Sequence, residues 1–371
     1  MLAVLSGGGT AGHINPALAL AEELRQRGWE VEFAGTPQGV EARLVPQAGV
    51  NFTAFEASGF DRSHPLSLVK GVAKIAASTK KAKRWFDDIK PDVVVGFGGY
   101  VSIPVARAAE QAGVPVVVHE QNSVMGMANK YLAKRAQAVC LTYDHSAQGL
   151  EDTSRVFVTG NPVRRSVIEA QRDEGRAFFG LSDDDFMLLV FGGSLGARHI
   201  NEALVALKDE LLSRPHLHVV HITGPKELDA VREALALTPE QEKRWHLMGY
   251  QDRMGETMAA ADAIVSRAGA TSLAEISARA IPAVLVPFPY ATEDHQTTNA
   301  RAYVEAGCAS LVPDDALGSE SFAQALTALI DDASVRAAMH EAALGQKTEE
   351  AASRLADVVV AAATGAADAI Q

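Results

Sequence analysis

The sequence has 371 residues, 47% of them hydrophobic and 22% charged, a composition typical of a globular protein large enough for about two domains. The net charge of −12 is uneven, because residues 1–160 carry +1 and residues 161–371 carry −13, which favours two domains with different partners. No apolar run reaches about 18 residues and no leader pattern opens the chain, so we expect a cytoplasmic protein without a membrane span. No broad basic surface with interleaved aromatics appears, so we expect no nucleic-acid binding.

Short, valine-rich apolar runs alternate with helix-length segments along the whole chain. This alternation predicts parallel strands in βαβ units, and therefore a doubly wound α/β sheet in each half. A turn signal at Gly160–Val163 predicts domains at 1–162 and 163–347, followed by a helix over about 348–363 that packs back on the first domain. The expected strands are 2–5, 31–34, 93–95, 116–119, 138–142 and 156–159 in the first half, and 187–191, 217–222, 245–248, 263–266, 283–286 and 309–312 in the second.

The first glycine turn, Ser6–His13, follows the first expected strand and opens a helix. Such a turn collects backbone N–H groups and the positive end of a helix dipole, which suits an anion. The glycines of this turn do not have the G-x-G-x-x-G spacing of a dinucleotide-binding loop. The second expected strand also ends at Phe33–Thr36 without the carboxylate that a dinucleotide site needs, so NAD binding loses its main support. A purely structural turn is the alternative, and the titratable ring of His13 at its mouth favours a function.

Segment 64–86 combines a basic side with an apolar and aromatic side. It holds six cations and no acid. A basic amphipathic helix suits an anionic membrane surface, where each cation contributes about 1 kcal/mol. A core helix with a solvated lysine face is the alternative. The expected membrane patch consists of Lys70, Lys74, Ile75, Lys80, Lys81, Lys83, Arg84 and Trp85.

Two polar loops of the first half, 96–104 and 119–129, also follow expected strands. Because the carboxyl ends of parallel strands meet at one edge of a sheet, we expect these loops to line the same crevice as His13. Their polar side chains suit a hydroxyl-rich ligand. The residues concerned are Tyr100, Glu120, Gln121, Asn122 and Asn129.

Three loops of the second half repeat the pattern of strand, turn and helix. Gly192–Gly196 is a second phosphate cradle with the Ser194 hydroxyl, and Ser266–Glu275 adds another glycine turn. Loop 287–299 adds polar side chains, and Arg164 beside the domain boundary is a charge partner for a diphosphate. Glycine turns at equivalent places in two similar domains predict a ligand-binding cleft between the carboxyl ends of two sheets.

Seven motifs, in order from residue 6 to 300, together resemble the MurG family of glycosyltransferases. They are GGTAGH (8–13), GFGGYV (96–101), HEQN (119–122), GNPVR (160–164), GGS (192–194), SRAGA (266–270) and DHQTTN (294–299). The resemblance implies the GT-B architecture, with an acceptor-binding, membrane-associating first domain and a UDP-GlcNAc-binding second domain. It implies an inverting hexosyltransferase that moves GlcNAc from UDP-GlcNAc to the C4 hydroxyl of MurNAc in undecaprenyl-linked lipid I, forming lipid II.

The same resemblance implies a peripheral protein on the cytoplasmic face of the bacterial cell membrane. Its partners would be UDP-GlcNAc, lipid I, the anionic membrane surface and other proteins of cell-wall synthesis. The implied processes are peptidoglycan and cell-wall biogenesis, cell shape and cell division.

Site residues are also implied by the resemblance, with Glu275 on the ribose and Gln296 on the sugar hydroxyls of the donor. The chain departs from the family at Ala11, where glycine is frequent, and at Leu195, where glutamine is usual, which puts one polar donor contact in question. The implied acceptor-side residues are Gly8, Gly9, Tyr100, Glu120, Gln121 and Asn129. The implied donor-binding residues are Thr10, Ala11, Gly12, Asn122, Arg164, Ser194, Gly269, Ala270, Glu275, His295, Gln296 and Asn299.

An inverting single displacement requires a base on the acceptor hydroxyl and charge stabilisation on the departing UDP. His13 is the candidate base, because histidine suits proton transfer near neutral pH. Helix N-termini behind Gly192–Gly196 and Gly269, with Arg164, are expected to neutralise the diphosphate. No Asp-x-Asp pair lies on a strand-end loop, and Asp183–Asp185 is expected to cap a helix or a loop, so no metal or other cofactor is expected to be obligatory.

Three alternatives stay open at this point. Another GT-B enzyme, such as a UDP-GlcNAc 2-epimerase or a glycolipid synthase, shares the fold, although an epimerase does not need the basic segment 64–86. A non-catalytic module that binds a lipid or a nucleotide sugar explains that segment but not His13. An NAD enzyme lacks its ribose carboxylate.

Overall fold

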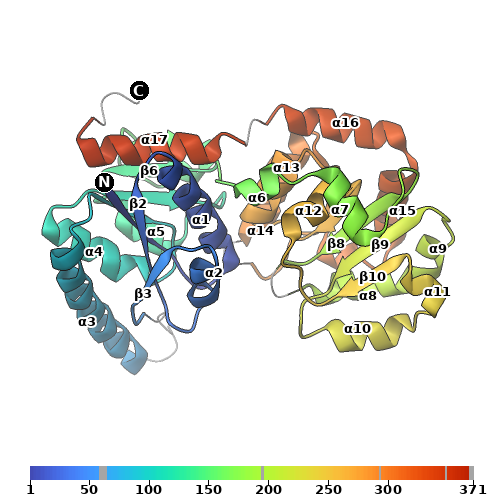
Figure 1. Ribbon diagram of the computed structural model, residues 1–371, viewed down its shortest axis with the longest axis horizontal. Helices are drawn as coiled ribbons and strands as arrows, with labels where there is room; N and C mark the ends of the chain where they lie inside the picture. The colour runs from blue at the N-terminus through green and yellow to red at the C-terminus, as the bar shows by residue number, and fades with distance from the viewer. Residues whose placement is uncertain (58–64, 194–195, 292–293, 347–348, 367–371) are drawn as a thin grey trace. The chain divides into compact units, whose positions relative to one another are not determined.

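The computed structural model describes residues 1–57, 65–193, 196–291, 294–346 and 349–366, without the side chains of 65–70 and 72. Internal contacts divide the chain into two units, Met1–Arg164 with Thr348–Gln371 (unit 1) and Arg165–Lys347 (unit 2). Each unit is a parallel sheet with helices packed on its faces (Figure 1). Among the described residues, no helix is both long enough and apolar enough to cross a membrane.

Unit 1 contains a seven-stranded sheet in the order β3-β2-β1-β4-β5-β6-β7. Six of these strands confirm the predictions from sequence. The sequence does not predict β3, because this edge strand is exposed or half-buried along its length and has little apolar content. The strands are β1 (Leu2–Ser6), β2 (Glu30–Gly35), β3 (Asn51–Ala54), β4 (Val93–Gly96), β5 (Val116–Glu120), β6 (Ala138–Leu141) and β7 (Val156–Val158).

Both faces of this sheet are buried, and the strands read as continuous apolar runs for that reason. Val93 and Val95 of β4 belong to the core on one face, whereas Val94 belongs to the core on the other. Cys140 is buried in the first of these cores, and Cys308 is buried in unit 2.

The helices of unit 1 include a last helix that comes from the end of the chain. Leu355 and Val359 of this helix share a core with Leu18 and Leu24 of the first helix, and Arg27 Nη1 lies 2.6 Å from Asp357 Oδ1. The helices are α1 (Ala11–Gln26), α2 (Glu41–Gln47), α3 (Pro65–Ile89), α4 (Ser102–Ala112), α5 (Met127–Ala133), the 3₁₀ helix η1 (Asp144–Ala147) and α17 (Ala351–Thr364).

Unit 2 contains a six-stranded sheet in the order β10-β9-β8-β11-β12-β13, and all six strands confirm the predictions. The strands are β8 (Phe186–Phe191), β9 (Leu217–Ile222), β10 (Trp245–Met248), β11 (Ala263–Ser266), β12 (Ala283–Leu285) and β13 (Ala309–Leu311). The helices are α6 (Arg165–Ile168), α7 (Arg172–Phe179), α8 (Arg198–Ala206), α9 (Lys208–Leu212), α10 (Leu228–Leu235), α11 (Pro239–Glu242), α12 (Met254–Ala260), α13 (Ala270–Ala278), α14 (His295–Glu305), η3 (Asp314–Ala316), α15 (Glu320–Asp331) and α16 (Ala333–Leu344).

Each sheet has one topological switch point, where the first and fourth strands of the unit lie side by side. Ser6 of β1 pairs with Gly96 of β4, and Phe191 of β8 pairs with Ser266 of β11. Ligands of open α/β sheets bind outside the carboxyl ends of strands at such points. The glycine turns recognised in the sequence therefore leave the sheets at the two places where a site is expected.

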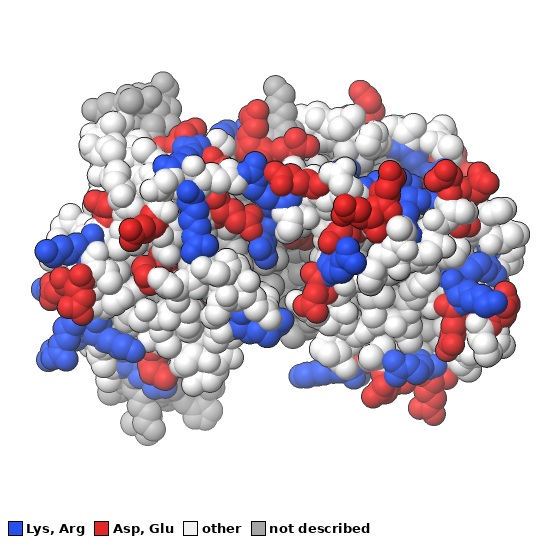
Figure 2. All heavy atoms as spheres, in the orientation of Figure 1, with Lys and Arg blue, Asp and Glu red and all other residues white. Residues whose placement is uncertain are grey.

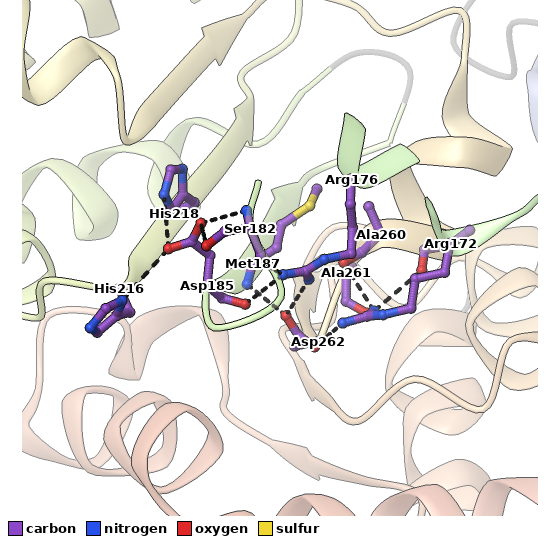
Figure 3. A network of polar contacts seen from close by, with 11 residues as sticks. Arg172, Arg176, Ser182, Asp185, Met187, His216, His218, Ala260, Ala261 and Asp262 are labelled. Atoms are coloured by element: carbon purple, nitrogen blue, oxygen red, sulfur yellow. Dashed lines mark hydrogen bonds and ion pairs between the residues drawn. The ribbon is translucent and has the colours of Figure 1, made fainter. Parts of the chain in front are cut away.

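A polar network fixes the opposite, amino-terminal edge of the unit 2 sheet (Figure 3). Asp262, just before β11, accepts hydrogen bonds from Arg172 Nη2 at 2.5 Å and from the Met187 backbone N–H at 2.7 Å. The buried Arg176 guanidinium lies 3.5 Å from the same carboxylate. These contacts tie α7 to the starts of β8 and β11.

Asp185 caps the loop before β8, as predicted. Its carboxylate accepts hydrogen bonds from the backbone N–H and the hydroxyl of Ser182, both at 2.7 Å, and His218 and His216 lie within 3.7 Å of it (Figure 3). Burial opposes ionisation, but the Ser182 bonds and the two imidazoles outweigh it and hold the pKa of Asp185 below its ordinary value.

His221 is fully buried in β9 of the unit 2 sheet, and its burial predicts that the fold loses stability in acid. Burial lowers the pKa of His221 to about 4, from an ordinary value of 6.5. A histidine with a lowered folded-state pKa contributes stability above pH 6.5 that is lost as the pH falls toward 4, here about 2 kcal/mol between pH 7.5 and pH 5. In His221→Gln, the free energy of unfolding in urea should fall less over this interval than in wild type.

The control for this prediction is His145→Gln, because the His145 side chain is exposed. It should keep the wild-type pH dependence. If the free energy of unfolding fell equally with pH in His221→Gln and in wild type, the folded state would not disfavour the charged His221 ring, and the prediction would be wrong.

Candidate active site

The first glycine loop of unit 1 holds His13 in a defined tautomer. His13 lies half-buried in the first turn of α1, and its Nδ1 is 2.9 Å from the Gly8 carbonyl oxygen. A carbonyl only accepts, so Nδ1 carries the proton and Nε2 of the neutral ring keeps its lone pair. The ring can therefore accept a proton at Nε2.

The 96–101 loop packs directly against this first loop. A Cβ at Gly99 would lie 2.6 Å from the Gly8 oxygen, and a Cβ at Gly98 would lie 3.3 Å from His13 Nε2. Both glycines also have positive φ, at +99° and +80° for Gly98 and Gly99. Only glycine meets both requirements here. The structure thus brings the GGTAGH and GFGGYV motifs into contact.

Glu120 organises the third polar loop of unit 1. Its carboxylate accepts hydrogen bonds from the backbone N–H groups of Asn122 and Gly126, both at 3.0 Å, and from Asn129 Nδ2 at 2.8 Å. Glu120, Gln121 and Asn129 are all 98% or more buried. Their polar atoms therefore shape the loop from within, while Asn122 and Tyr100 are only half-buried.

His119 is a second histidine of this region, with a structural environment unlike that of His13. Its Nε2 donates to the Gly160 carbonyl at 2.9 Å, and its Nδ1 lies 3.1 Å from Gln121 Nε2. Complete burial lowers its pKa to about 4, so the ring is neutral near pH 7. His119 links β5 to the Gly160 turn.

Glu41, at the start of α2, is a residue of this region that the sequence does not predict. It is fully buried, and its Oε1 accepts from the Thr36 N–H at 2.9 Å and the Thr36 hydroxyl at 2.5 Å. Its Oε2 accepts from the Gly9 N–H at 3.3 Å. The sequence shows no carboxylate at the end of the second strand, but Glu41, five residues beyond Thr36, reaches the first glycine loop.

Arg164 is placed in unit 1. Its guanidinium pairs with Glu22 of α1, with Nη2 2.9 Å and Nε 3.0 Å from Glu22 Oε1. Thr10 and Gly9 are exposed, and Ala11 and Gly12 are half-buried at the start of α1.

In unit 2, the Gly192–Gly196 loop precedes α8, and its residues Ser194 and Leu195 lie outside the described part of the chain. Gly196 has φ +81°, and a Cβ there would lie 2.0 Å from the Thr223 carbonyl oxygen. A larger residue cannot occupy this position, because the loop packs on the backbone that follows β9.

The two other loops of unit 2 contact each other. Gln296 Oε1 accepts from the backbone N–H of Ala268 at 3.2 Å and of Phe288 at 3.0 Å, and Asn299 Nδ2 donates to the Ala268 carbonyl at 3.3 Å. Gly269 is the N-cap of α13, Ala270 begins that helix, and Glu275 is buried in its second turn. His295, at the start of α14, is half-buried.

A buried ion pair that the sequence does not predict braces these loops. Arg267 Nη1 lies 2.5 Å from Asp314 Oδ1. The same nitrogen donates hydrogen bonds to the carbonyls of Val286 and Pro287. The other carboxylate oxygen, Asp314 Oδ2, lies 2.5 Å from His199 Nδ1. Burial favours a neutral Asp314, but His199 and Arg267 outweigh it and hold the pKa of this carboxyl below its ordinary value. No local pattern joins residues so distant in sequence.

The basic segment forms part of α3. Lys74, Lys80, Lys83 and Arg84 are exposed, and Figure 2 shows Lys and Arg side chains over this part of the face. The exposed Lys81 donates to the Ala54 carbonyl at 2.6 Å.

The apolar members of the predicted patch are turned partly inward. Trp85 is half-buried, with its ring 5.4 Å from that of Phe55 and 5.5 Å from that of Phe86, and Ile75 is also half-buried. The side chain of Lys70 lies outside the description. Within the ranges that the structure describes, no group of three or more His, Cys, Asp or Glu residues is arranged to hold a metal ion.

Comparison with protein families identifies both units. Residues 3–141 match the glycosyltransferase family 28 N-terminal domain, and residues 187–355 match the glycosyltransferase family 28 C-terminal domain. Among solved structures, MurG of Acinetobacter baumannii is 29% identical, with a TM-score of 0.73 and coverage of 97% of this chain and 99% of that one. A Listeria monocytogenes structure described as a UDP-N-acetylglucosamine 2-epimerase shares the fold at 16% identity and a TM-score of 0.71, covering 97% and 96%.

Curated relatives agree over almost the whole chain. A Leuconostoc mesenteroides protein is 42% identical, covering 96% of this chain and 97% of its own length, and one from Halothermothrix orenii is 39% identical, covering 90% and 91%. Both are UDP-N-acetylglucosamine--N-acetylmuramyl-(pentapeptide) pyrophosphoryl-undecaprenol N-acetylglucosamine transferases. The chain has the GT-B fold and belongs to the MurG family of N-acetylglucosamine transferases, within glycosyltransferase family 28.

Proposed function

We propose that this protein transfers GlcNAc from UDP-GlcNAc to the C4 hydroxyl of MurNAc in lipid I, and so makes lipid II for peptidoglycan synthesis. The observation that carries this proposal is His13, whose Nδ1 bonds the Gly8 carbonyl and whose Nε2 lies beside two glycine loops at the switch point of unit 1. In a family of GlcNAc transferases, such a group suits the base that an acceptor hydroxyl requires.

In this reaction, His13 Nε2 takes the proton of the C4 hydroxyl while the oxygen attacks the anomeric carbon of GlcNAc. The bond from that carbon to the UDP oxygen breaks at the same time, and UDP leaves with the electron pair. Attack from the face opposite the leaving group inverts the anomeric configuration. Unit 1 contributes the acceptor side, where we place Gly8, Gly9, Tyr100, Glu120, Gln121 and Asn129.

Unit 2 supplies most of the donor site in this proposal. Helices α8 and α13 begin directly after the loops that follow β8 and β11. The backbone N–H groups at these helix N-termini can bind the diphosphate, and they stabilise the negative charge that grows on it as UDP leaves. Glu275 accepts hydrogen bonds from the ribose and Gln296 contacts the sugar hydroxyls, with Ser194, Gly269, Ala270, His295 and Asn299 around them. Thr10, Ala11, Gly12, Asn122 and Arg164 complete the donor contacts from unit 1. No step in this scheme passes through a metal.

We further propose that the enzyme is a peripheral protein on the cytoplasmic face of the cell membrane, where it meets its lipid acceptor and other cell-wall synthesis proteins. The exposed cations of α3 support this location, because lysine and arginine side chains are attracted to anionic headgroups. The attraction is mainly electrostatic, since Trp85 packs against Phe55.

The reaction is tested by incubating the protein with radiolabelled UDP-GlcNAc and a lipid I analogue. We expect label in a lipid-linked disaccharide and one UDP released for each GlcNAc transferred. Label recovered only as free sugar, or as an epimerised nucleotide sugar, would refute the transferase assignment and favour a hydrolase or an epimerase.

The role of His13 is tested by His13→Ala. Turnover should fall by roughly 100-fold or more, which is the usual contribution of a positioned base, while the affinity for UDP-GlcNAc is retained. The matched control is His145→Ala, an exposed histidine of the same unit, which should keep wild-type turnover. Near-normal turnover of His13→Ala would remove His13 from the chemistry.

Membrane attraction is tested by reversing two exposed charges in Lys80→Glu/Lys83→Glu. Lys81 is left in place because it bonds the end of β3. Binding to vesicles containing anionic lipid should weaken by roughly 10-fold or more, since each cation contributes about 1 kcal/mol near the surface. The control, Lys134→Glu/Lys226→Glu, makes the same charge change at exposed positions off α3 and should bind as wild type. Equal binding of all three proteins would refute the α3 patch.

A further inference from the structure

One peptide group connects Glu41 to His13. The Gly9 N–H and the Gly8 C=O belong to the same peptide bond, and they bond in opposite directions. The N–H donates to Glu41 Oε2 at 3.3 Å, and the C=O accepts from His13 Nδ1 at 2.9 Å. The buried carboxylate and the imidazole therefore share a single polarisable amide.

Three glycines surround the Glu41 side chain and leave space for it, because they lack a Cβ atom. A Cβ would lie 2.6 Å from Glu41 Oε1 at Gly8, 2.6 Å from Glu41 Cγ at Gly35 and 2.2 Å from Glu41 Oε2 at Gly39. The side chain is fully buried and has three hydrogen-bond donors, two from Thr36 and one from Gly9. The carboxylate is thus held in one position beside the loop.

We propose that Glu41 is a positioning residue for His13, acting through the Gly8–Gly9 peptide as the third member of a base-orienting chain. This inference rests on the proposed role of His13 as the base. Hydrogen bonds in series polarise one another, so the bond to the carboxylate makes the Gly8 oxygen a stronger acceptor. That oxygen fixes the Nδ1–H tautomer and stabilises the positive charge that the ring gains when Nε2 takes the acceptor proton.

The substitution Glu41→Gln breaks this chain at one bond. The glutamine oxygen remains best placed toward Thr36, where two donors meet it, so the amide NH₂ faces the Gly9 N–H and cannot accept from it. The contact that anchors α2 to Thr36 is kept, while the contact to the peptide is lost.

We expect Glu41→Gln to lower kcat by roughly 10-fold, the effect of losing a charge-assisted hydrogen bond, with KM for UDP-GlcNAc unchanged. The matched control is Thr36→Val, which removes a hydroxyl bond from the other side of the same carboxylate and leaves the Gly9 contact in place. It should keep kcat near the wild-type value.

A double-mutant cycle separates this role from a purely structural one. If Glu41 acts through His13, adding Glu41→Gln to His13→Ala should change the residual turnover by no more than about 2-fold. A full 10-fold loss in the His13→Ala background, or wild-type kcat in Glu41→Gln alone, would overturn the proposal. Near-normal turnover of His13→Ala refutes the base itself, which is a different result.

The ¹⁵N NMR signals of the His13 ring give a second test, measured in the wild-type protein and in Glu41→Gln. The proposal requires the proton of the neutral ring to reside on Nδ1, and Glu41→Gln should increase the share of the Nε2–H tautomer. A predominantly Nε2–H ring in wild type, or tautomer shares identical in the two proteins, would overturn it.

Discussion

The parallel pairing of the first strand of each unit with its fourth strand determines where the candidate site residues lie. Ser6 pairs with Gly96 and Phe191 with Ser266, so neighbouring loops leave each sheet at the same level and pack on one another. The loops must then satisfy their own backbone groups at close range. Glycine at positions such as 98 and 196 is a consequence of that crowding, since a Cβ there would meet His13 or the Thr223 carbonyl.

Buried carboxylates support the loops at both switch points. Glu41 bonds the first glycine loop, Glu120 bonds four donors of the 119–129 loop, and Asp314 pairs with Arg267 beside the loop after β11. A buried carboxylate is stable only with several donors around it, and it restrains all of them to one geometry. This chain thus uses internal anions to hold rigid the loops that we propose meet a diphosphate and a sugar.

Most of the fold could be predicted from sequence, because strands buried on both faces appear as apolar runs. Val93–Val95 is such a run, whereas β3 escaped prediction as a partly exposed edge strand. The contact between the Ala268 and Gln296 loops was also predictable, since both follow adjacent parallel strands. Arg267 and Asp314 could not be paired in advance, because no local period relates residues so far apart.

The sequence by itself determined the family, the two doubly wound sheets and the positions of the glycine turns, because these depend on local periodicity and on motifs that are contiguous in the chain. Only the tertiary structure decided which partner each polar group finds. It placed the proton of His13 on Nδ1, turned Trp85 toward Phe55, and brought Glu41 to the Gly9 N–H. Such contacts depend on distances between segments that are remote in sequence, so no local pattern contains them.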